Sequence, residues 1–132
     1  MQKINFKTSK RTELIDITKE VQEIIDKSKV EEGVCLLFCP HTTAGLTINE
    51  NADPSVKSDI LGVLNRLIPE GAGYAHQEGN ADSHVKSSLF GSSLTIFIQA
   101  GQLAFGTWQG IYFCEGDGPR QRQVWIKIVK QE

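Results

Sequence analysis

The segment from Ser93 to Ile111 constrains the fold most, because it combines an apolar strand pattern with closely spaced glycines. Apolar and polar residues alternate from Leu94 to Gln99, as they do in a strand with one buried face. Gly101 and Gly106 then allow the chain to turn, since glycine adopts positive φ angles without steric cost. A second strand is predicted from Gly110 to Glu115, so this part of the chain is expected to form sheet.

Strands are also predicted in the rest of the chain, which makes sheet the main structure. The segment from Gly33 to Cys39 is continuously apolar and ends at Pro40, a pattern typical of a strand buried on both faces. Near the start, Ile4–Phe6 and Leu14–Ile17 flank a polar turn, and we expect them to pair as a hairpin. The remaining strands are predicted at Leu46–Asn49 and Gln123–Val129.

Two helices are predicted in the first half of the chain, and a short third helix follows. Thr18 is a suitable N-cap for the first, in which apolar residues recur at helical spacing. The second begins at Asp53 and Pro54, a favoured N-cap followed by a favoured first residue. The third is expected around Ser83 to Ser88. Together the elements predict an α+β fold with mainly antiparallel β-sheet layers, formed as a single domain by residues 1–132.

Composition excludes several classes of protein. The net charge is −2 and there is no basic excess, so nucleic-acid binding is not expected. No apolar stretch approaches the roughly 18 residues of a membrane helix, and the first residues lack the apolar core of a signal peptide. We therefore expect a cytoplasmic protein that does not bind membranes. The three cysteines are interpreted as buried free thiols, rather than as disulfides or a thiolate zinc site.

A first polar cluster runs from His41 to Pro54, beside the apolar strand. We interpret His41 as a catalytic acid/base group or metal ligand, and Glu50 as a catalytic carboxylate. Asp53 is better explained as the helix cap. The neutral polar side chains are candidates for substrate binding, although they could instead satisfy hydrogen bonds of turns. The candidates of this kind are Thr42, Thr43 and Asn49.

A second polar cluster lies between Glu70 and Asp82. The segment is polar and contains three glycines, which predicts a long loop, and long loops in small domains are commonly functional. His76 lies within it and His84 follows in the short helix. Imidazole nitrogen is a ligand for zinc and similar divalent ions, but the spacing matches no closed zinc motif. A metal site therefore requires that folding brings His41, His76 and His84 together. Without that convergence, the histidines are exposed residues with no chemical role.

Basic residues near both ends of this region are candidates for contacts with a phosphate group. Lys86 lies in the short helix, where its ammonium group could bind a phosphate oxygen or simply remain a solvated surface charge. Arg120 and Arg122 are two residues apart at the entry to a strand, which places both guanidinium groups on one face. These arginines could equally pair with carboxylates, within the fold or in a neighbouring subunit.

Three ordered blocks of sequence resemble the YjbQ-like (UPF0047) family. The blocks are His41 to Pro54, Tyr74 to Ser88, and Gly106-Thr107-Trp108-Gln109 with the later Arg122. The resemblance covers the chain from about Phe6 to Val129 and implies a compact α+β domain, usually assembled as a homotrimer. It also places Asn80 among the substrate-binding residues. Trp108 is interpreted as the anchor of a hairpin or of a subunit contact, in preference to a substrate-stacking group.

The resemblance further implies a reaction. Some relatives have a weak secondary thiamine-phosphate synthase activity, which joins hydroxymethylpyrimidine diphosphate to thiazole phosphate with loss of pyrophosphate. Cationic groups would have to stabilise the departing pyrophosphate, and a divalent ion on the three histidines would act with Glu50, Lys86 and Arg122. Histidine ligands favour zinc, manganese or a similar ion, whereas a diphosphate substrate favours magnesium.

Two functions therefore follow as expectations from the residues and the resemblance. The first is a low-turnover transferase that resembles thiamine-phosphate synthase and acts on a phosphorylated or anionic small molecule. The second is a non-catalytic oligomeric module that binds a metal ion or a small anion. The polar density of the two clusters makes a purely structural protein the weaker interpretation.

Overall fold

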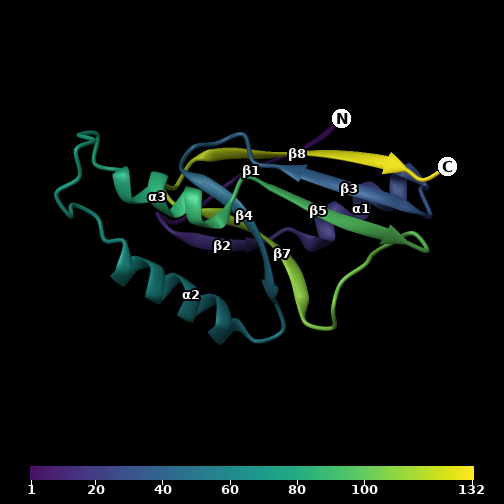
Figure 1. Cartoon of the computed structure of the whole chain (residues 1–132), viewed down its shortest axis with the longest axis horizontal. Helices are drawn as coiled ribbons and strands as arrows, with labels where there is room; N and C mark the ends of the chain where they lie inside the picture. Colours follow the sequence, from purple (N-terminus) through teal and green to yellow (C-terminus); the bar gives the residue numbers. More distant parts are fainter.

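Two antiparallel sheets share one core in the structure, a computed structural model that describes residues 1–132 (Figure 1). The larger sheet has the strand order β1 (Gln2–Lys7), β8 (Gln121–Lys130), β3 (Gly33–Phe38), β5 (Ser93–Gln99) and β6 (Gln102–Leu103). The smaller sheet has the order β2 (Glu13–Asp16), β7 (Gln109–Glu115) and β4 (Ala44–Glu50). The predicted α+β fold with mainly antiparallel sheet is therefore confirmed.

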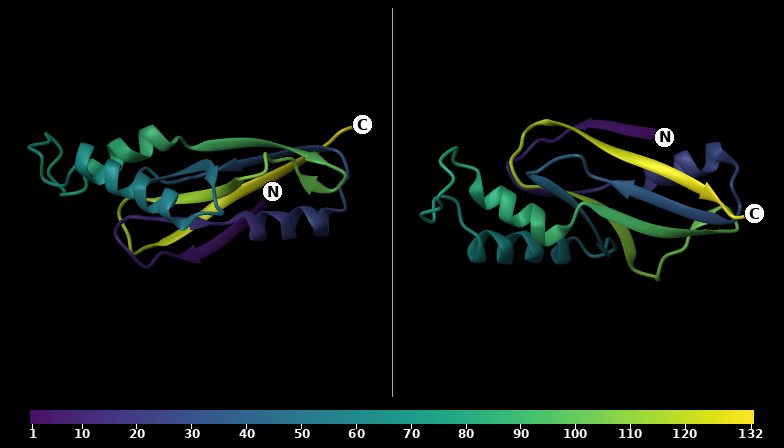
Figure 2. Two further views of the ribbon diagram at one scale, coloured as in Figure 1. Left: turned by 90° about the horizontal axis from the view of Figure 1, so that it is seen from below. Right: turned by 45° about the horizontal axis from the view of Figure 1, so that its top comes forward.

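Three helices complete the fold. Helix α1 (Thr18–Ser28) packs its buried Val21 and Ile25 into the core, but it begins at Thr18 and not after it, so Thr18 is not the N-cap. Helices α2 (Pro54–Leu67) and α3 (Ala81–Phe90) lie at one end of the sheets, with the loop between them projecting beyond (Figure 2). None of the three helices is long and apolar enough to span a membrane.

The predicted cap of the second helix is confirmed. Asp53 is the N-cap of α2, and its Oδ1 accepts hydrogen bonds from the backbone N–H of Ser55 at 2.9 Å and from its Oγ at 2.7 Å. A short polar side chain at this position satisfies backbone donors that the first turn leaves free. These bonds lower the pKa of the Asp53 carboxyl, as expected for a carboxylate that accepts hydrogen bonds.

The predicted hairpin of the first two strands is wrong, because β1 and β2 belong to different sheets. Strand β1 pairs with β8, with Gln2 opposite Ile126, whereas β2 pairs with β7, with Glu13 opposite Glu115. The polar segment between β1 and β2 crosses from one sheet to the other. Alternation of apolar residues reports which face of a strand is buried but does not specify its partner, so nearby strands are not always neighbours in the sheet.

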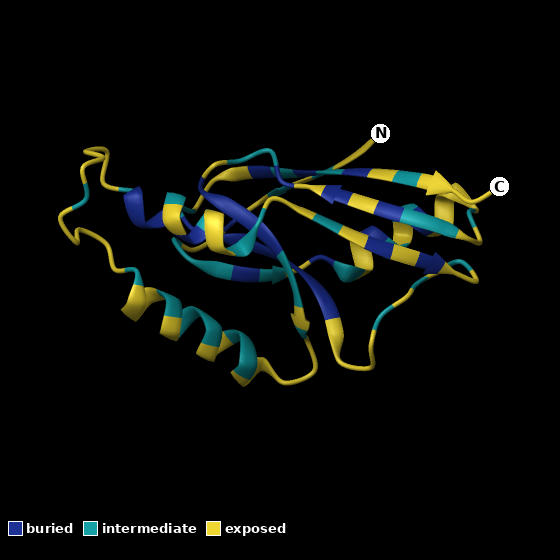
Figure 3. Cartoon of the chain, in the orientation of Figure 1, coloured by how far each residue is buried: buried dark blue, intermediate teal, exposed yellow.

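Strand β3 is buried on one face only, which corrects the prediction of burial on both. Cys35 and Leu37 point into the core, whereas Leu36 and Phe38 are 38% and 44% exposed. The same alternation is visible along β5 and β8 (Figure 3). The inner face packs against α1 and the smaller sheet, and no element of the chain covers the outer face.

All three cysteines are free and buried, as the sequence predicts. Burial raises the pKa of Cys35 to about 11, because an apolar environment disfavours the thiolate. Burial also raises the pKa of Cys114 well above its ordinary value, and the nearby Cys39 adds to the effect. The thiols therefore behave as small core side chains and not as nucleophiles or metal ligands.

Candidate functional site

A polar cavity of about 380 Å³ lies at the end of the sheets where α3 begins. Three segments far apart in the sequence form it: the β3–β4 loop, the residues around the start of α3, and the connection from β7 to β8. No hydrophobic side chain lines it. The predicted site residues that line this cavity are His41, Thr42, Thr43, Asn80, His84, Arg120 and Arg122.

Arg122 is fixed at the cavity by a buried carboxylate. Its Nε donates to Glu115 Oε2 at 2.7 Å, and its Nη2 donates to Glu115 Oε1 and, at 2.8 Å, to Thr43 Oγ1. Both charged residues are almost completely buried, with exposed fractions of 6% and 1%. Burial alone would raise the pKa of Glu115, but the hydrogen bonds from Arg122 and the Asp117 amide outweigh it and lower that pKa.

A second carboxylate, Asp117, joins two walls of the cavity. Its Oδ2 accepts a hydrogen bond from Asn80 Nδ2 at 2.8 Å and another from Arg120 Nη2 at 2.9 Å. Burial opposes ionisation of Asp117, but these hydrogen bonds and the positive charges of Arg120 and Arg11 lower its pKa. Of the two predicted interpretations of the arginines, pairing with carboxylates inside the fold is thus confirmed, although both arginines still line the cavity.

Sequence reasoning missed Glu115 and Asp117 as parts of the site. The only available signal was their position: both lie within seven residues of Arg120 and Arg122, Glu115 just before the glycine-rich turn and Asp117 within it. A carboxylate so close to an arginine in sequence is a plausible partner. Which arginine each carboxylate contacts depends on how β7 and β8 are placed in the two sheets.

His41 is held in one orientation by β8. Its Nε2 accepts a hydrogen bond from the backbone N–H of Gln123 at 3.0 Å, so the neutral ring carries its proton on Nδ1. Partial burial and the positive charge of Arg122 lower the pKa of His41, and the ring is therefore neutral at pH 7. In this form Nδ1–H is a hydrogen-bond donor, and His41 has no free nitrogen with which to accept a proton.

His76 and His84 lie side by side. Their ring centroids are 5.1 Å apart in an edge-to-face arrangement, and His76 Nε2 is 3.9 Å from Glu78 Oε1. His84 lines the cavity, whereas His76 does not. The fold thus brings His41 and His84 to one cavity from distant parts of the chain, with His76 beside His84.

The arrangement does not fit the predicted metal site. No three side chains among His, Cys, Asp and Glu are placed to hold one metal ion. A histidine that binds a metal normally donates a hydrogen bond from its other ring nitrogen, but Nε2 of His41 accepts one from the Gln123 amide. The side chains as placed do not form a site for zinc or a similar ion, so metal binding remains a prediction from the sequence.

Two predicted residues of the first cluster lie far from the cavity. The extended strand β4 separates Ala44, near the cavity, from Glu50 by about 20 Å. Glu50 pairs with Gln109, and the next amide, of Asn51, donates to the carbonyl of Trp108 at 3.0 Å. The prediction that Glu50 acts beside His41 is therefore wrong for a single chain, and the same holds for Asn49.

Lys86 is neither a cavity residue nor a solvated surface lysine. Its side chain is 5% exposed, and Nζ contacts Asn65 Oδ1 at 2.8 Å and Asp82 Oδ2 at 3.3 Å. Asp82 also accepts a hydrogen bond from Arg11 at 2.9 Å. Lys86 therefore forms a buried ion pair within α3 and links α3 to α2 through its hydrogen bond to Asn65, and it does not line the cavity that holds His41 and Arg122.

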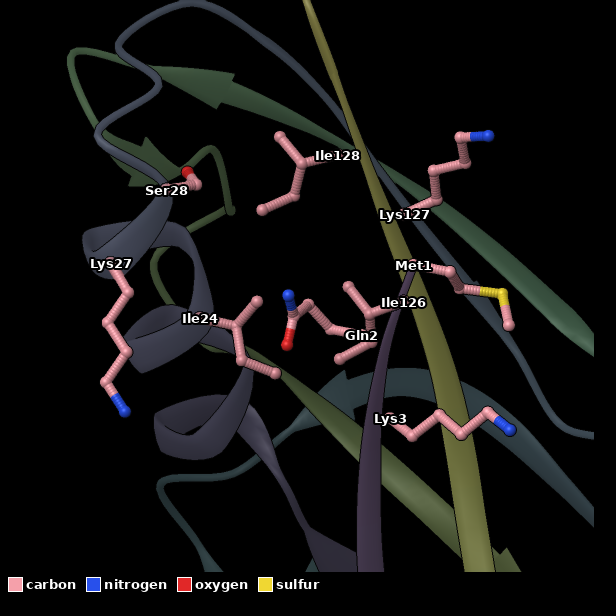
Figure 4. Close-up of a pocket in the computed structure, with 9 residues that line it drawn as sticks. All are labelled: Met1, Gln2, Lys3, Ile24, Lys27, Ser28, Ile126, Lys127 and Ile128. Atoms are coloured by element: carbon pink, nitrogen blue, oxygen red, sulfur yellow. The ribbon is translucent and has the colours of Figure 1, made fainter.

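A hollow of about 530 Å³ between β1, α1 and β8 has a different character (Figure 4). Ile24, Ile126 and Gln2 face its interior, whereas the long side chains of Lys27 and Lys127 extend away from it. None of its lining residues is a histidine, cysteine or carboxylate. Lysines are the only titratable side chains that line this hollow, whereas the polar cavity combines imidazole, guanidinium and carboxylate groups, so the polar cavity is the better candidate for the functional site.

Comparison with known proteins supports a single family. A family model described as UPF0047 protein YjbQ-like matches residues 2–131. The chain is 54% identical to the UPF0047 protein MJ1081 of Methanocaldococcus jannaschii over 127 residues, which cover 96% of this chain and 92% of that protein. It is 50% identical to the UPF0047 protein YugU of Bacillus subtilis, with 96% of each chain covered.

Comparison with solved structures supports the same family. A YjbQ/UPF0047 family protein of Clostridium acetobutylicum superposes with a TM-score of 0.95 at 52% identity, covering 98% of this chain and 100% of the other. The hypothetical protein APE1520 of Aeropyrum pernix superposes with a TM-score of 0.94 at 32% identity, covering 98% of each chain. The agreement extends over both sheets and all three helices. The chain therefore belongs to the YjbQ-like UPF0047 family.

Proposed function

We propose that the polar cavity binds the phosphate groups of a small molecule and that the protein is a low-turnover transferase resembling thiamine-phosphate synthase. One observation carries this proposal: two guanidinium and two imidazole groups, from segments far apart in the chain, line the same cavity. Hydrogen bonds from guanidinium groups to phosphate are charge-assisted and directional. A phosphorylated or similarly anionic small molecule is the ligand class that this set of donors fits best.

The cavity is organised before a ligand arrives. Glu115 and Thr43 hold Nε and Nη2 of Arg122, and neither contact uses Nη1. A prepositioned donor stabilises developing negative charge without reorganisation during the reaction. Because Glu115 and Asp117 partly neutralise the arginines, anion binding depends on directed N–H groups more than on net positive charge.

The two histidines have different roles in the proposed reaction. The thiazole nitrogen forms a bond to the pyrimidine methylene carbon, and the bond from that carbon to the diphosphate oxygen breaks. Pyrophosphate leaves with the electron pair of the broken bond. Arg120, Arg122 and the Nδ1–H of His41 stabilise its charge, whereas His84 is the candidate for proton transfer to the departing oxygen.

The test measures binding and turnover separately. Calorimetric titration with pyrophosphate should give saturable binding that Arg122→Lys weakens at least tenfold, because lysine lacks the planar guanidinium that contacts Glu115 through two nitrogens and keeps Nη1 for a ligand. Pyrophosphate release is then assayed with both thiamine precursors in the native protein and in His84→Ala. Lys27→Ala, which removes an exposed cation outside the cavity, is the matched control. Unchanged binding in Arg122→Lys would refute the proposed role of the cavity.

A second candidate function is a non-catalytic module that binds a small anion. The observation that favours it is that both arginines pair with carboxylates. This pairing reduces the positive charge available to an anion, so a bound anion is held less tightly and can be released. Saturable pyrophosphate binding with no release of product from either precursor would support this candidate over the transferase. For both functions we propose a homotrimer in the cytoplasm, and light scattering would give its mass as three times the 14.6 kDa chain.

A further inference from the structure

Glu78 is the only acidic side chain that lines the polar cavity, and the binding of phosphate groups does not use it. It lies in the loop between α2 and α3, directly before Gly79, whose φ of 86° is one that glycine adopts without strain. Asn80 follows and donates to Asp117 Oδ2 at 2.8 Å. The turn at Gly79 and this hydrogen bond hold the end of the loop, with Glu78, beside the cavity.

The carboxylate of Glu78 has no strong partner within the chain. Glu115 and Asp117 are each paired with an arginine. The single ion-pair contact of Glu78, in contrast, is with His76 Nε2 at 3.9 Å, which exceeds the range of a hydrogen bond. Its side chain is 79% exposed, so both carboxylate oxygens are available to a donor group of a ligand.

Groups of opposite charge lie on different segments of the cavity lining. Arg120 and Arg122 lie where β8 begins, whereas Glu78 lies in the loop between α2 and α3. The Arg120 side chain is 52% exposed, and Nη1 of Arg122 takes no part in its buried hydrogen bonds, so both side chains offer donors to an anion. A ligand in the cavity therefore meets cationic donors from one segment and a carboxylate from another.

The charges around the cavity do not cancel. Each arginine is balanced by the carboxylate with which it pairs, and the His41 ring is neutral because partial burial and the charge of Arg122 lower its pKa. Glu78 therefore adds a negative charge that no arginine balances. A ligand with only negative charge contacts the arginines but is repelled by Glu78, whereas a ligand that also carries a positive group is attracted by both.

We propose that the cavity selects small molecules that carry a phosphate group and, within a few bonds of it, a positively charged nitrogen. The arginines bind the phosphate and Glu78 binds the nitrogen. The inference rests on the proposed function and gives Glu78 a role in that reaction. The thiazole nitrogen becomes positively charged as it bonds to the pyrimidine methylene carbon, and Glu78 stabilises this charge while the arginines stabilise the departing pyrophosphate.

Two phosphates of nearly equal size test this selection by calorimetric titration. Aminopropyl phosphate ends in an ammonium group where butyl phosphate ends in a methyl group. The native protein should bind the aminopropyl compound about fivefold more tightly, which is the upper range for an ion pair with an exposed carboxylate. In Glu78→Gln this preference should disappear, and pyrophosphate should bind more tightly than in the native protein because a repelling charge is lost.

Glu23→Gln is the matched control, because Glu23 is an exposed carboxylate of α1 that does not line the cavity. It should retain the native preference and the native affinity for pyrophosphate. Glu78→Lys extends the series, since reversal of the charge should make butyl phosphate the better ligand and tighten pyrophosphate binding further. Equal affinities of the native protein for the two phosphates, or a preference that survives in Glu78→Gln, would overturn the inference.

The same titrations distinguish this inference from the proposed function. Pyrophosphate binding without a preference between the two phosphates would overturn the selection by Glu78 and leave the cavity as an anion site. A preference that depends on Glu78, in a protein that releases no pyrophosphate from the thiamine precursors, would support the selection and overturn the transferase. If none of the three phosphates binds to the native protein, both proposals are wrong.

Discussion

The buried ion pair between Glu115 and Arg122 makes a quantitative prediction about stability. Glu115→Gln preserves the shape of the side chain but removes the charge that compensates the buried guanidinium. Removing one partner of a buried ion pair costs about 3–5 kcal/mol, and we expect about 3 kcal/mol here because glutamine keeps one hydrogen-bond acceptor and Thr43 still contacts Arg122. This is a large part of the roughly 5–15 kcal/mol that stabilises a typical domain.

The expected change in melting temperature follows from the chain length. The entropy of unfolding of 132 residues near 60 °C is about 0.28 kcal/mol/K, so a loss of 3 kcal/mol lowers Tm by about 11 °C. Urea unfolding, followed by fluorescence of Trp108 and Trp125 at one fixed protein concentration, measures the free energy directly. Calorimetry under the same conditions gives Tm.

A double variant tests the physical reason for the loss. Glu115→Leu/Arg122→Met replaces both charges by apolar groups, and such replacements of a buried pair are often neutral. We expect the double variant to be more stable than Glu115→Gln, because it leaves no unpaired buried charge. A loss below about 1 kcal/mol in Glu115→Gln, or a double variant less stable than the single one, would refute the interpretation of this pair.

Three further predictions follow from the core and the site. Folding lowers the pKa of Glu115 and Asp117, so the stability that these carboxylates contribute is complete above their unfolded pKa of about 4 and is lost as the pH falls below it. Equal free energies of unfolding at pH 7 and pH 3 would contradict this prediction. In Gly45→Ala the added Cβ would lie 2.6 Å from the Gly91 carbonyl oxygen, so we expect a lower urea midpoint, and an unchanged midpoint would show that the backbone can move apart. Since burial raises the pKa of Cys35 to about 11, a thiol reagent at pH 8 should label it only as fast as the protein unfolds, and rapid labelling of the native protein would be inconsistent with this burial.

Individual elements followed from the sequence where the governing interactions are local. The Asp53 cap depends on residues two positions apart, and the periodicity of α1 depends on one helix facing one core. The pairing of β1 and β2 depends instead on strands more than 90 residues away, β8 and β7. Local alternation carries no information about that choice, which is why a hairpin was predicted and is absent.

The same distinction between local and long-range interactions applies to the candidate site. The sequence determined which residues can take part in acid/base chemistry or anion binding. It also indicated that His41 follows the end of a strand and that His84 lies near the start of a helix. Only the tertiary structure decided that these two share a cavity with Arg120 and Arg122, that Lys86 is sealed in an ion pair, and that Glu50 lies at the far end of β4. The physical reason is a difference in range. The period of apolar residues, two in a strand and 3.6 in a helix, depends on neighbouring residues and can be seen in the sequence. The distance between polar groups of different elements depends on strand order and register, which the packing of the whole core determines.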